Sequence, residues 1–382
     1  MAVTYYLLYV AITSLRPLPH EAPPLDRDTR DSQSACRISR PSHQHVFYLK
    51  THKTGSTTIY SIMAEYTRTH DLFALLPKGH HINIFYKNLE PEHMLTLYPG
   101  VNKYDMVFNH NIFDPKIYEL LHNDTFTFTT LRKPKTNFIS SFNYWSQLGG
   151  FTYLVEIPGN GNEKLDNYLK SPEMYEPKNR YMSFTNNRQS IDLGWDLNYD
   201  FNDAEYTKSF LRGLEQHFDI FLIFEYFDES LVMLKRILNW RTQDIIFFKK
   251  LKFTNLTERQ KRKTSMTPEQ EAVFNAMAVA DNALYEHFLA AFKEKIALEP
   301  GLQEEVEEFK AVLEKVKHFC ADDTSQQLVV PRGDWTDEVT IVKDKCYWLA
   351  VDETAYTDYL RHDQWFRYNG TRARKQSAIE ER

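Results

Sequence analysis

The chain has 382 residues, of which 42% are hydrophobic and 26% charged, and its net charge is −6. This composition is typical of a folded globular protein and excludes disorder throughout the chain. The chain has 46 basic and 52 acidic side chains, and this slightly acidic balance argues against a protein that coats nucleic acid. A local basic groove is still compatible with this net charge.

The N-terminal 44 residues divide into two segments. Residues 1–15 (MAVTYYLLYVAITSL) are uncharged but shorter than the ~20 apolar residues of a membrane-spanning helix, and they resemble a clipped signal-anchor. Residues 16–44 are rich in Pro, Asp, Arg and Ser without periodicity, which predicts a disordered stem. An anchor followed by a stem and a globular part predicts a type II single-pass membrane protein with a lumenal catalytic domain.

Cysteines and glycosylation signals also bear on the compartment. Sequons for N-glycosylation begin at Asn123, Asn255 and Asn369. The chain has 3 cysteines, which form no zinc-binding pattern. Cys320 and Cys346 are candidates for a disulfide, and the alternative is that all the thiols are free.

From residue 45 onward, apolar runs alternate with amphipathic ones. The apolar or β-branched runs predict strands at 46–49, 104–108, 125–131 and 220–224. The periodic runs predict helices at 59–66, 114–121, 134–145, 229–240, 269–296 and 301–319. This alternation predicts an α/β fold with a mostly parallel sheet flanked by helices. We expect one large domain over 45–320 with helical additions, and a C-terminal extension, 321–382, of undetermined structure.

The loop after the first strand has the chemistry of a phosphate cradle. It reads Lys-Thr-His-Lys-Thr-Gly-Ser-Thr-Thr over residues 50–58 and leads into a helix. The unpaired N–H groups and dipole of a helix N-terminus attract an anion, and Lys50 and Lys53 add positive charge. Gly55, one of only 12 glycines in the chain, lets the backbone approach the anion. A polar turn of this kind also occurs without any ligand.

A second candidate anion site follows the 125–131 strand. Arg132 ends that strand, and Ser140 lies eight residues further on, two turns into a helix that begins near Pro134. The two side chains can converge on one phosphate beside the first loop. Two anion sites at adjacent strand ends suit a ligand with two separated phosphates. The Walker A and GxGxxG patterns of kinases and dehydrogenases are absent.

This pair of loops resembles that of the sulfotransferases that use 3′-phosphoadenosine 5′-phosphosulfate (PAPS). More narrowly, residues 49–58 (LKTHKTGSTT) resemble the signature of the galactose 3-O-sulfotransferase family, which includes galactosylceramide sulfotransferase. The similarity continues through 131–145, 192–194, 218–240 and 283–288. It implies the P-loop-like fold of these enzymes, PAPS as the donor, and a galactose-terminated glycolipid or glycan as the acceptor. It also implies a place in the Golgi membrane.

The resemblance assigns roles to the loop residues. It implies that the first loop holds the 5′-phosphosulfate through Lys50, Thr51, Lys53, Thr54, Gly55, Ser56, Thr57 and Thr58. Arg132 and Ser140 would hold the 3′-phosphate. No metal is expected, because Lys and Arg replace the cation that kinases use.

Sulfuryl transfer also needs a group that stabilises the leaving charge and a group that accepts the proton of the sugar hydroxyl. Lys53 is placed to stabilise the charge, with Lys50 assisting. A neutral histidine suits the proton transfer. His110 is favoured because it ends the neighbouring strand, and His52, inside the loop, is the close alternative.

Other functions stay open at this stage. A uronyl 2-O-type or other glycosaminoglycan sulfotransferase would favour a broad basic cleft, against which the net charge of −6 argues. A catalytically inactive protein that binds a nucleotide or a glycan is the third alternative. The presence of Lys53, Arg132 and Ser140 argues against it.

Overall fold

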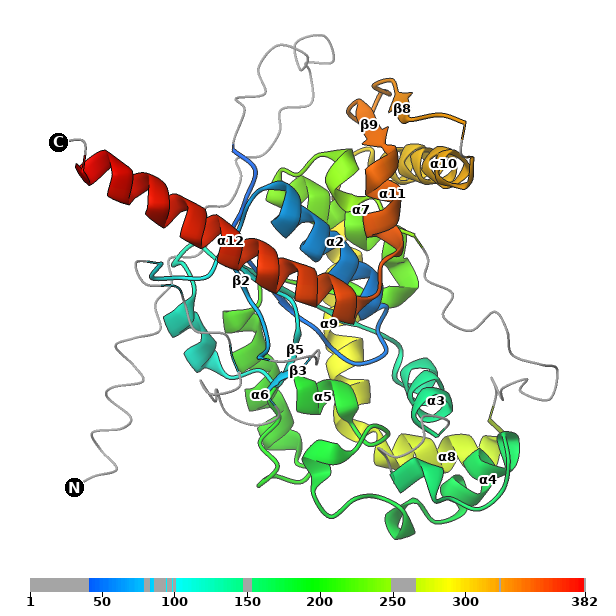
Figure 1. Ribbon diagram of the computed structural model, residues 1–382. Helices are drawn as coiled ribbons and strands as arrows, with labels where there is room; N and C mark the ends of the chain where they lie inside the picture. The colour runs from blue at the N-terminus through cyan, green and yellow to red at the C-terminus, as the bar shows by residue number, and fades with distance from the viewer. Residues whose placement is uncertain are drawn as a thin grey trace. The chain divides into compact units, whose positions relative to one another are not determined.

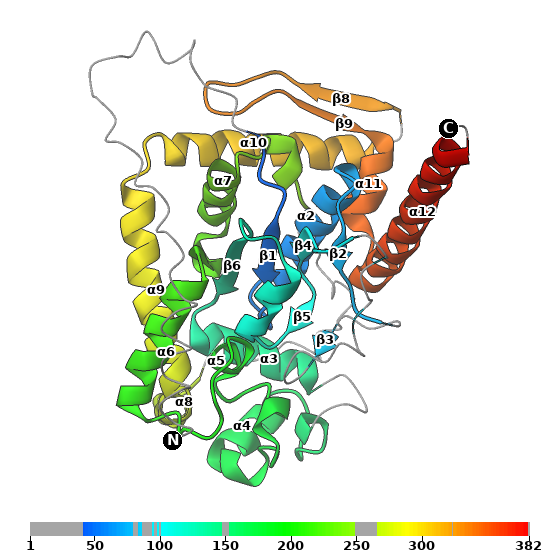
Figure 2. The ribbon, with the colours of Figure 1, turned by 90° about the vertical axis from the view of Figure 1, so that its left-hand side faces the viewer.

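A five-stranded parallel sheet with the strand order β2-β4-β1-β6-β7 lies at the centre of the fold (Figures 1 and 2). The computed structural model describes residues 41–78, 83–85, 94, 98, 101–146, 153–248, 266–322 and 324–380. The strands are β1 Val46–Leu49, β2 Ala74–Leu75, β4 Met106–Val107, β6 Phe126–Leu131 and β7 Ile220–Ile223. A second, two-stranded parallel sheet pairs β3 (Asn83–Phe85) with β5 (His110–Asn111).

The sheet confirms the predicted α/β architecture. The residues of β1 and β7 are all buried, as expected for strands covered on both faces. β1 lies between β4 and β6, so the loops that follow these three parallel strands emerge at one edge of the sheet. In open α/β sheets, ligands bind in a crevice at this edge, outside the carboxyl ends of the strands. β4 is shorter than the predicted strand, and His110 lies in β5 beyond its end.

Helices flank the sheet (Figures 1 and 2). The α-helices described are α2 Ser56–Thr69, α3 Pro134–Trp145, α4 Asn162–Lys170, α5 Arg188–Asp192, α6 Ala204–His217, α7 Phe227–Leu238, α8 Pro268–Met277, α9 Val279–Ala297, α10 Leu302–Ala321, α11 Lys343–Ala350 and α12 Glu353–Glu380. The 3-10 helices described are η2 Pro115–Leu120, η3 Tyr153–Val155, η4 Pro172–Met174, η5 Arg180–Met182, η6 Phe224–Tyr226 and η7 Thr242–Ile245.

The helix predicted over 269–296 is two helices, α8 and α9. Thr267 begins α8 through a capping box with Gln270. At the break, the side-chain amide of Asn187 donates to the Met277 carbonyl at 2.6 Å, and its oxygen accepts from the Asp281 N–H at 2.9 Å. A distant side chain therefore satisfies backbone groups that a continuous helix would pair internally.

The C-terminal segment, for which the sequence predicted no structure, packs on the same unit. An antiparallel hairpin of β8 (Gln327–Val330) and β9 (Val339–Val342) lies along α10 (Figure 2). A disulfide joins Cys320 of α10 to Cys346 of α11 with a Cα–Cα distance of 5.5 Å, which confirms that pairing. α11 and α12 both contact α2, the helix that follows the phosphate-cradle loop (Figure 1).

Ser42–Arg382 form one compact unit by their contacts. The predicted anchor over 1–15, most of the predicted stem and the sequon at Asn255 lie outside the described residues. Within the described part of the chain, no helix has both the length and the apolar character needed to span a membrane.

Candidate active site

The loop between β1 and α2 is curled by two residues in the left-handed region, Lys53 with φ 60° and Gly55 with φ 78°. The hydroxyl of Thr51 donates to the Thr130 carbonyl at 2.6 Å and lies 2.9 Å from the Thr54 hydroxyl. These two threonines therefore fix the shape of the loop. α2 begins after Gly55 without a side-chain cap, so the N–H groups of its first turn can serve an anion.

Gly55 is required by both its conformation and its surroundings. A Cβ at this position would lie 2.8 Å from two ring carbons of Phe224, and φ is +78°. We expect Gly55→Ala to lower the free energy of unfolding by about 1–3 kcal/mol. Gly213→Ala in α6 is the matched control, since nothing lies within 4 Å of its added Cβ. That helix substitution should raise stability by about 0.5–1 kcal/mol. Urea unfolding of both variants checks the prediction, and equal effects would contradict it.

The second predicted loop meets the first one. Arg132 donates through Nη1 to the Lys53 carbonyl at 3.1 Å, and its Nε donates to Thr136 at 3.1 Å. The ammonium of Lys53 lies 3.7 Å from the ring centroid of Tyr144 on α3. Arg132 thus bonds to the loop around Lys53, and the convergence of Arg132 with Ser140 on one phosphate stays a prediction. Ser140 lies on α3 as expected and is partly exposed, but no hydrogen bond joins it to Arg132 in the described structure.

The two candidate bases, His52 and His110, stack on each other. Their ring centroids are 4.1 Å apart and their planes differ by 18°. His110 Nδ1 lies 2.8 Å from the Lys50 carbonyl, and His52 Nδ1 lies 2.9 Å from the Asp192 carboxylate. Both acceptors are oxygens without hydrogen, so each Nδ1 carries a proton. Each Nε2 is then a lone-pair nitrogen that can accept a proton.

Burial and charge set the protonation of this pair. Burial lowers the pKa of His52, although Asp192 opposes this effect. Burial, with the charge of Lys50, holds the pKa of His110 well below its ordinary value. Burial opposes ionisation of Asp192, but Arg188 and His52 together keep its pKa below the ordinary value. The site therefore holds two neutral imidazoles. Within the described residues, His52 hydrogen-bonds to a carboxylate, whereas His110 hydrogen-bonds to a backbone carbonyl.

Asp192 orders the site from a short helix, α5. Its carboxylate accepts the backbone N–H of His52 at 2.8 Å and pairs with Arg188 at 2.5 Å. α5 is in turn fastened to α9, because Asp281 accepts from the N–H and the hydroxyl of Ser190, both at 2.7 Å. Burial raises the pKa of Asp281 to about 6.

Sequence patterns missed several residues of this site. Asp192 belongs to the 192–194 string that resembles the family, but its contact with His52 has no sequence signal. Asn137 donates to the His52 carbonyl at 2.8 Å, and its position in the first turns of α3 was the only available cue. Glu353 lies 303 positions from Lys50, its partner, and nothing in the sequence relates them.

The charge of Lys50 is paired with a carboxylate of the C-terminal helix, α12. Its ammonium donates to Glu353 at 2.7 Å, and the two side chains are 1% and 7% exposed. The hydroxyl of Tyr60 on α2 donates to the Glu353 carbonyl at 3.1 Å. Because the ammonium of Lys50 is held in this buried ion pair, Lys53 is the better candidate for the cation that binds the donor.

We expect Glu353→Gln to cost about 3–5 kcal/mol of unfolding free energy, because it leaves the Lys50 ammonium buried without its carboxylate. The double variant Lys50→Met/Glu353→Leu should recover most of this loss, since well-packed apolar side chains often replace a buried ion pair. Glu205→Gln breaks an exposed ion pair with Lys208 and is the control, with little change expected. Chemical denaturation measures all three, and a Glu353→Gln protein as stable as the control would contradict the prediction.

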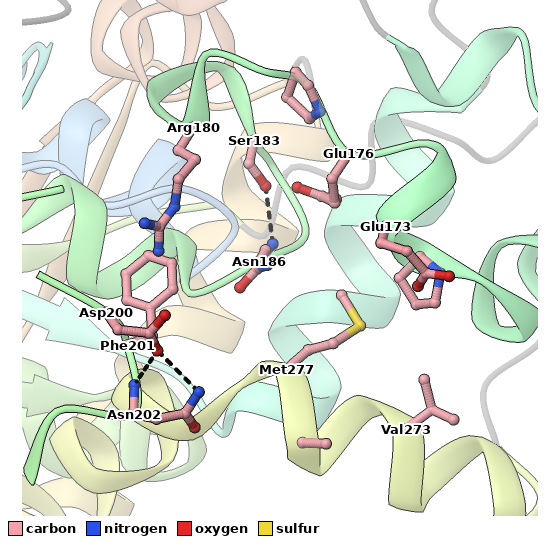
Figure 3. Close-up of a pocket in the computed structure, with 13 residues that line it drawn as sticks. Glu173, Glu176, Arg180, Ser183, Asn186, Asp200, Phe201, Asn202, Val273 and Met277 are labelled. Atoms are coloured by element: carbon pink, nitrogen blue, oxygen red, sulfur yellow. Dashed lines mark hydrogen bonds between the residues drawn. The ribbon is translucent and has the colours of Figure 1, made fainter. Parts of the chain in front are cut away.

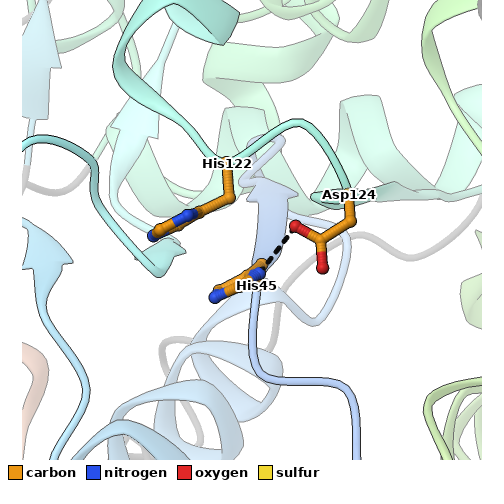
Figure 4. Close-up of side chains that lie close together, drawn as sticks. All are labelled: His45, His122 and Asp124. Carbon is orange, nitrogen blue, oxygen red and sulfur yellow. Dashed lines mark hydrogen bonds and ion pairs between the residues drawn. The ribbon is translucent and has the colours of Figure 1, made fainter.

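A second cluster of titratable groups lies at the opposite, amino ends of the strands (Figure 4). His45, His122 and Asp124 each offer a ligand atom, and these atoms lie within 4.8 Å of one another. The two imidazoles stack with a centroid distance of 3.9 Å and an interplanar angle of 12°. An imidazole binds a metal ion through a nitrogen lone pair, which lies in the plane of the ring. Because the rings of His45 and His122 are stacked in separate, nearly parallel planes, one ion cannot be bound by both rings unless one of them turns. This cluster is remote from the β1–α2 loop, and the expectation of a metal-free reaction stays a prediction.

A parallel sheet with an uncapped helix N-terminus, a lysine and an arginine at one edge can bind an anionic group. The family model described as galactose-3-O-sulfotransferase matches residues 2–335. The chain belongs to this family, and it is a sulfotransferase.

Individual relatives agree with this assignment. Galactose-3-O-sulfotransferase 2 of Sus scrofa is 32% identical over 74% of this chain and 70% of its own length. Galactose-3-O-sulfotransferase 3 of Mus musculus is 28% identical over 89% of this chain and 82% of its own. Galactosylceramide sulfotransferase of Bos taurus is 28% identical over 80% of this chain and 70% of its own.

Proposed function

We propose that this enzyme transfers the sulfuryl group of PAPS to the 3-hydroxyl of a galactosyl residue on a glycolipid or glycan. The observation that carries the proposal is the β1–α2 loop, in which His52 and Lys53 are neighbours, Arg132 donates to the Lys53 carbonyl at 3.1 Å, and the first turn of α2 has no side-chain cap. Cations and N–H donors beside a proton-accepting imidazole are what sulfuryl transfer to a hydroxyl requires. The names of the relatives support galactose as the acceptor.

The loop residues fit a donor with separated anionic groups. When bound, PAPS supplies the sulfuryl group and leaves as adenosine 3′,5′-bisphosphate. Lys53 and the N–H groups of α2 stabilise the negative charge that grows on the bridging oxygen. Arg132 and Ser140 would bind the 3′-phosphate. The acceptor oxygen bonds to sulfur as the bond to the leaving phosphate oxygen breaks, and its proton passes to the protein.

We assign that proton to Nε2 of His52. Asp192 stabilises the imidazolium that forms on His52, in the way a buried carboxylate orients a catalytic histidine. Burial and the charges of Lys50 and Arg188 disfavour a proton on His110. In this proposal His110 holds the His52 ring by stacking.

We further propose that the enzyme works in the Golgi lumen, held to the membrane by its N-terminal segment. The Cys320–Cys346 disulfide supports an oxidising compartment. Asn123 is exposed in the turn before β6 and is accessible for glycosylation. Asn369 lies in α12 and is the second candidate within the described residues.

Transfer of radiolabelled sulfate from PAPS tests the proposal. The acceptors are galactosylceramide, lactosylceramide and N-acetyllactosamine, with desulfated dermatan as the uronyl acceptor. We expect labelled product from at least one galactoside and none from dermatan. Labelling of dermatan alone, or of no acceptor, would overturn the proposed function.

A further inference from the structure

Lys50 begins the predicted donor loop, yet its ammonium is closed off from solvent. The side chain is 1% exposed, and Glu353 pairs with it at 2.7 Å. The pocket in Figure 3 is lined by residues of 172–186, 200–202 and 273–277, and none of them belongs to the β1–α2 loop or to α12. An anion bound at the loop therefore meets the Lys50 ammonium only after Glu353 has moved.

This ion pair is within electrostatic reach of the candidate active site. Burial is the main cause of the lowered pKa values of His52 and His110, and the charge of Lys50 lowers both further. Burial also raises the pKa of Tyr144 on α3, and the charge of Glu353 raises it further. A change in the pairing of Lys50 therefore changes the electrostatic field at groups that surround the donor loop.

Glu353 lies in a part of α12 that can separate from its neighbours at low cost. It is the first residue of α12, which residues 351–352 join to α11. Beyond this point, the hydroxyl of Tyr356 donates to Glu65 on α2 at 2.6 Å, and Arg361 donates to a backbone carbonyl at 2.9 Å. Because helix ends open more readily than helix interiors, Glu353 can leave Lys50 while α12 stays on α2 (Figure 1).

The exchange of one anionic partner for another avoids an unpaired buried charge. Removing one partner of a buried ion pair is strongly destabilising, since the other charge is left uncompensated. A phosphate or sulfate oxygen that takes the place of the Glu353 carboxylate keeps the Lys50 ammonium paired, and the displaced carboxylate regains its hydration. The negative charge of a donor at the loop also repels Glu353 and favours its departure.

We propose that the Lys50–Glu353 ion pair is an autoinhibitory contact, in which Glu353 and the donor compete for the Lys50 ammonium. The inference rests on the proposed function, because the donor is taken to be PAPS. Donor binding separates Lys50 from Glu353 and opens the first turn of α12, and Lys50 then joins Lys53 in binding the 5′-phosphosulfate. Glu353 acts through Lys50 and sets the affinity for the donor.

The first test is the Kd of adenosine 3′,5′-bisphosphate, measured by calorimetry on the full chain. We expect Glu353→Gln to bind it about tenfold more tightly than the wild type, because the competing carboxylate is lost, although the same substitution lowers stability. The double variant Lys50→Met/Glu353→Leu has no ammonium to release and should show no such gain. Tyr356→Phe is the matched control, since it removes another buried hydrogen bond of α12 and keeps the ion pair, and its Kd should equal that of the wild type.

Hydrogen exchange in the wild type is the second test, and it does not depend on how any variant folds. The N–H groups of Thr354, Ala355 and Tyr356 donate to Asp352 at 2.9–3.1 Å. Addition of adenosine 3′,5′-bisphosphate should speed exchange at these amides and slow it in the first turn of α2.

The outcomes separate this inference from the proposed function. If the wild type binds the bisphosphate but Glu353→Gln binds it no more tightly, or exchange at 354–356 is not faster, the inference is wrong while the function stands. If Tyr356→Phe or the double variant gains as much affinity as Glu353→Gln, Glu353 does not act through Lys50 and the inference is again wrong. If the wild type does not bind the bisphosphate, the inference and the proposed use of PAPS both fail.

Discussion

Replacing Lys53 with alanine is expected to lower kcat by about 10²–10³-fold, the usual cost of removing one preorganised group that stabilises transition-state charge. Lys53 lies in the loop between β1 and α2, and Arg132 donates to its carbonyl at 3.1 Å, which fixes the backbone of this residue. The loss should appear mainly in kcat, because the charge on the bridging oxygen develops in the transition state. Steady-state kinetics with PAPS as the varied substrate measure it.

Lys135→Ala controls for a general loss of positive charge near the donor. Lys135 is on α3, and its ammonium pairs with Glu271 at 2.8 Å. We expect its kcat to stay near the wild-type value. A Lys53→Ala enzyme that keeps a kcat similar to that of Lys135→Ala would remove Lys53 from the catalytic machinery.

The second large effect is expected at His52. His52→Ala should lower kcat/KM by about 10²–10⁴-fold, the contribution typical of a positioned general base. His110→Phe keeps an aromatic ring against His52 and should lose less than tenfold. Retention of activity in His52→Ala, with its loss in His110→Phe, would transfer the base to His110.

The pH dependence provides an independent check on the base. A base works only when it is neutral, so activity falls as the pH drops through its pKa. Burial lowers the pKa of His52, which places the acid limb of the kcat/KM profile below the pH at which an exposed histidine titrates. Asp192 raises this pKa, so Asp192→Asn should move the limb to still lower pH and reduce kcat. If Asp192→Asn moves the acid limb to higher pH, or leaves it in place, the proposal that Asp192 acts on a His52 base is contradicted.

The parts of the fold that the sequence predicted are those fixed by local pattern. β1 and α3 have the predicted bounds, because a short buried run and a proline at the first helical position are strong signals. The break between α8 and α9 had no such signal, since it depends on Asn187 from another part of the chain. The hairpin of β8 and β9 was missed because each of its strands has only 4 residues.

The same distinction applies to the candidate site. Lys53, Gly55 and Arg132 could be identified because each lies in the segment between a recognisable strand and the helix that follows it. The contact of Asp192 with His52 and that of Glu353 with Lys50 could not be predicted, because the partners are 140 and 303 positions apart in sequence. Their effect on His52 and Lys50 depends on burial and charge, which only the folded chain brings together.

The position of the new sulfate ester tests the central claim most directly. The product made from PAPS and N-acetyllactosamine should show, by NMR, a downfield shift of the galactose H3 signal. The 3-deoxygalactose analogue of the same acceptor should yield no sulfated product. A product sulfated at another hydroxyl, or continued sulfation of the 3-deoxy acceptor, would contradict the account of this protein as a galactose 3-O-sulfotransferase.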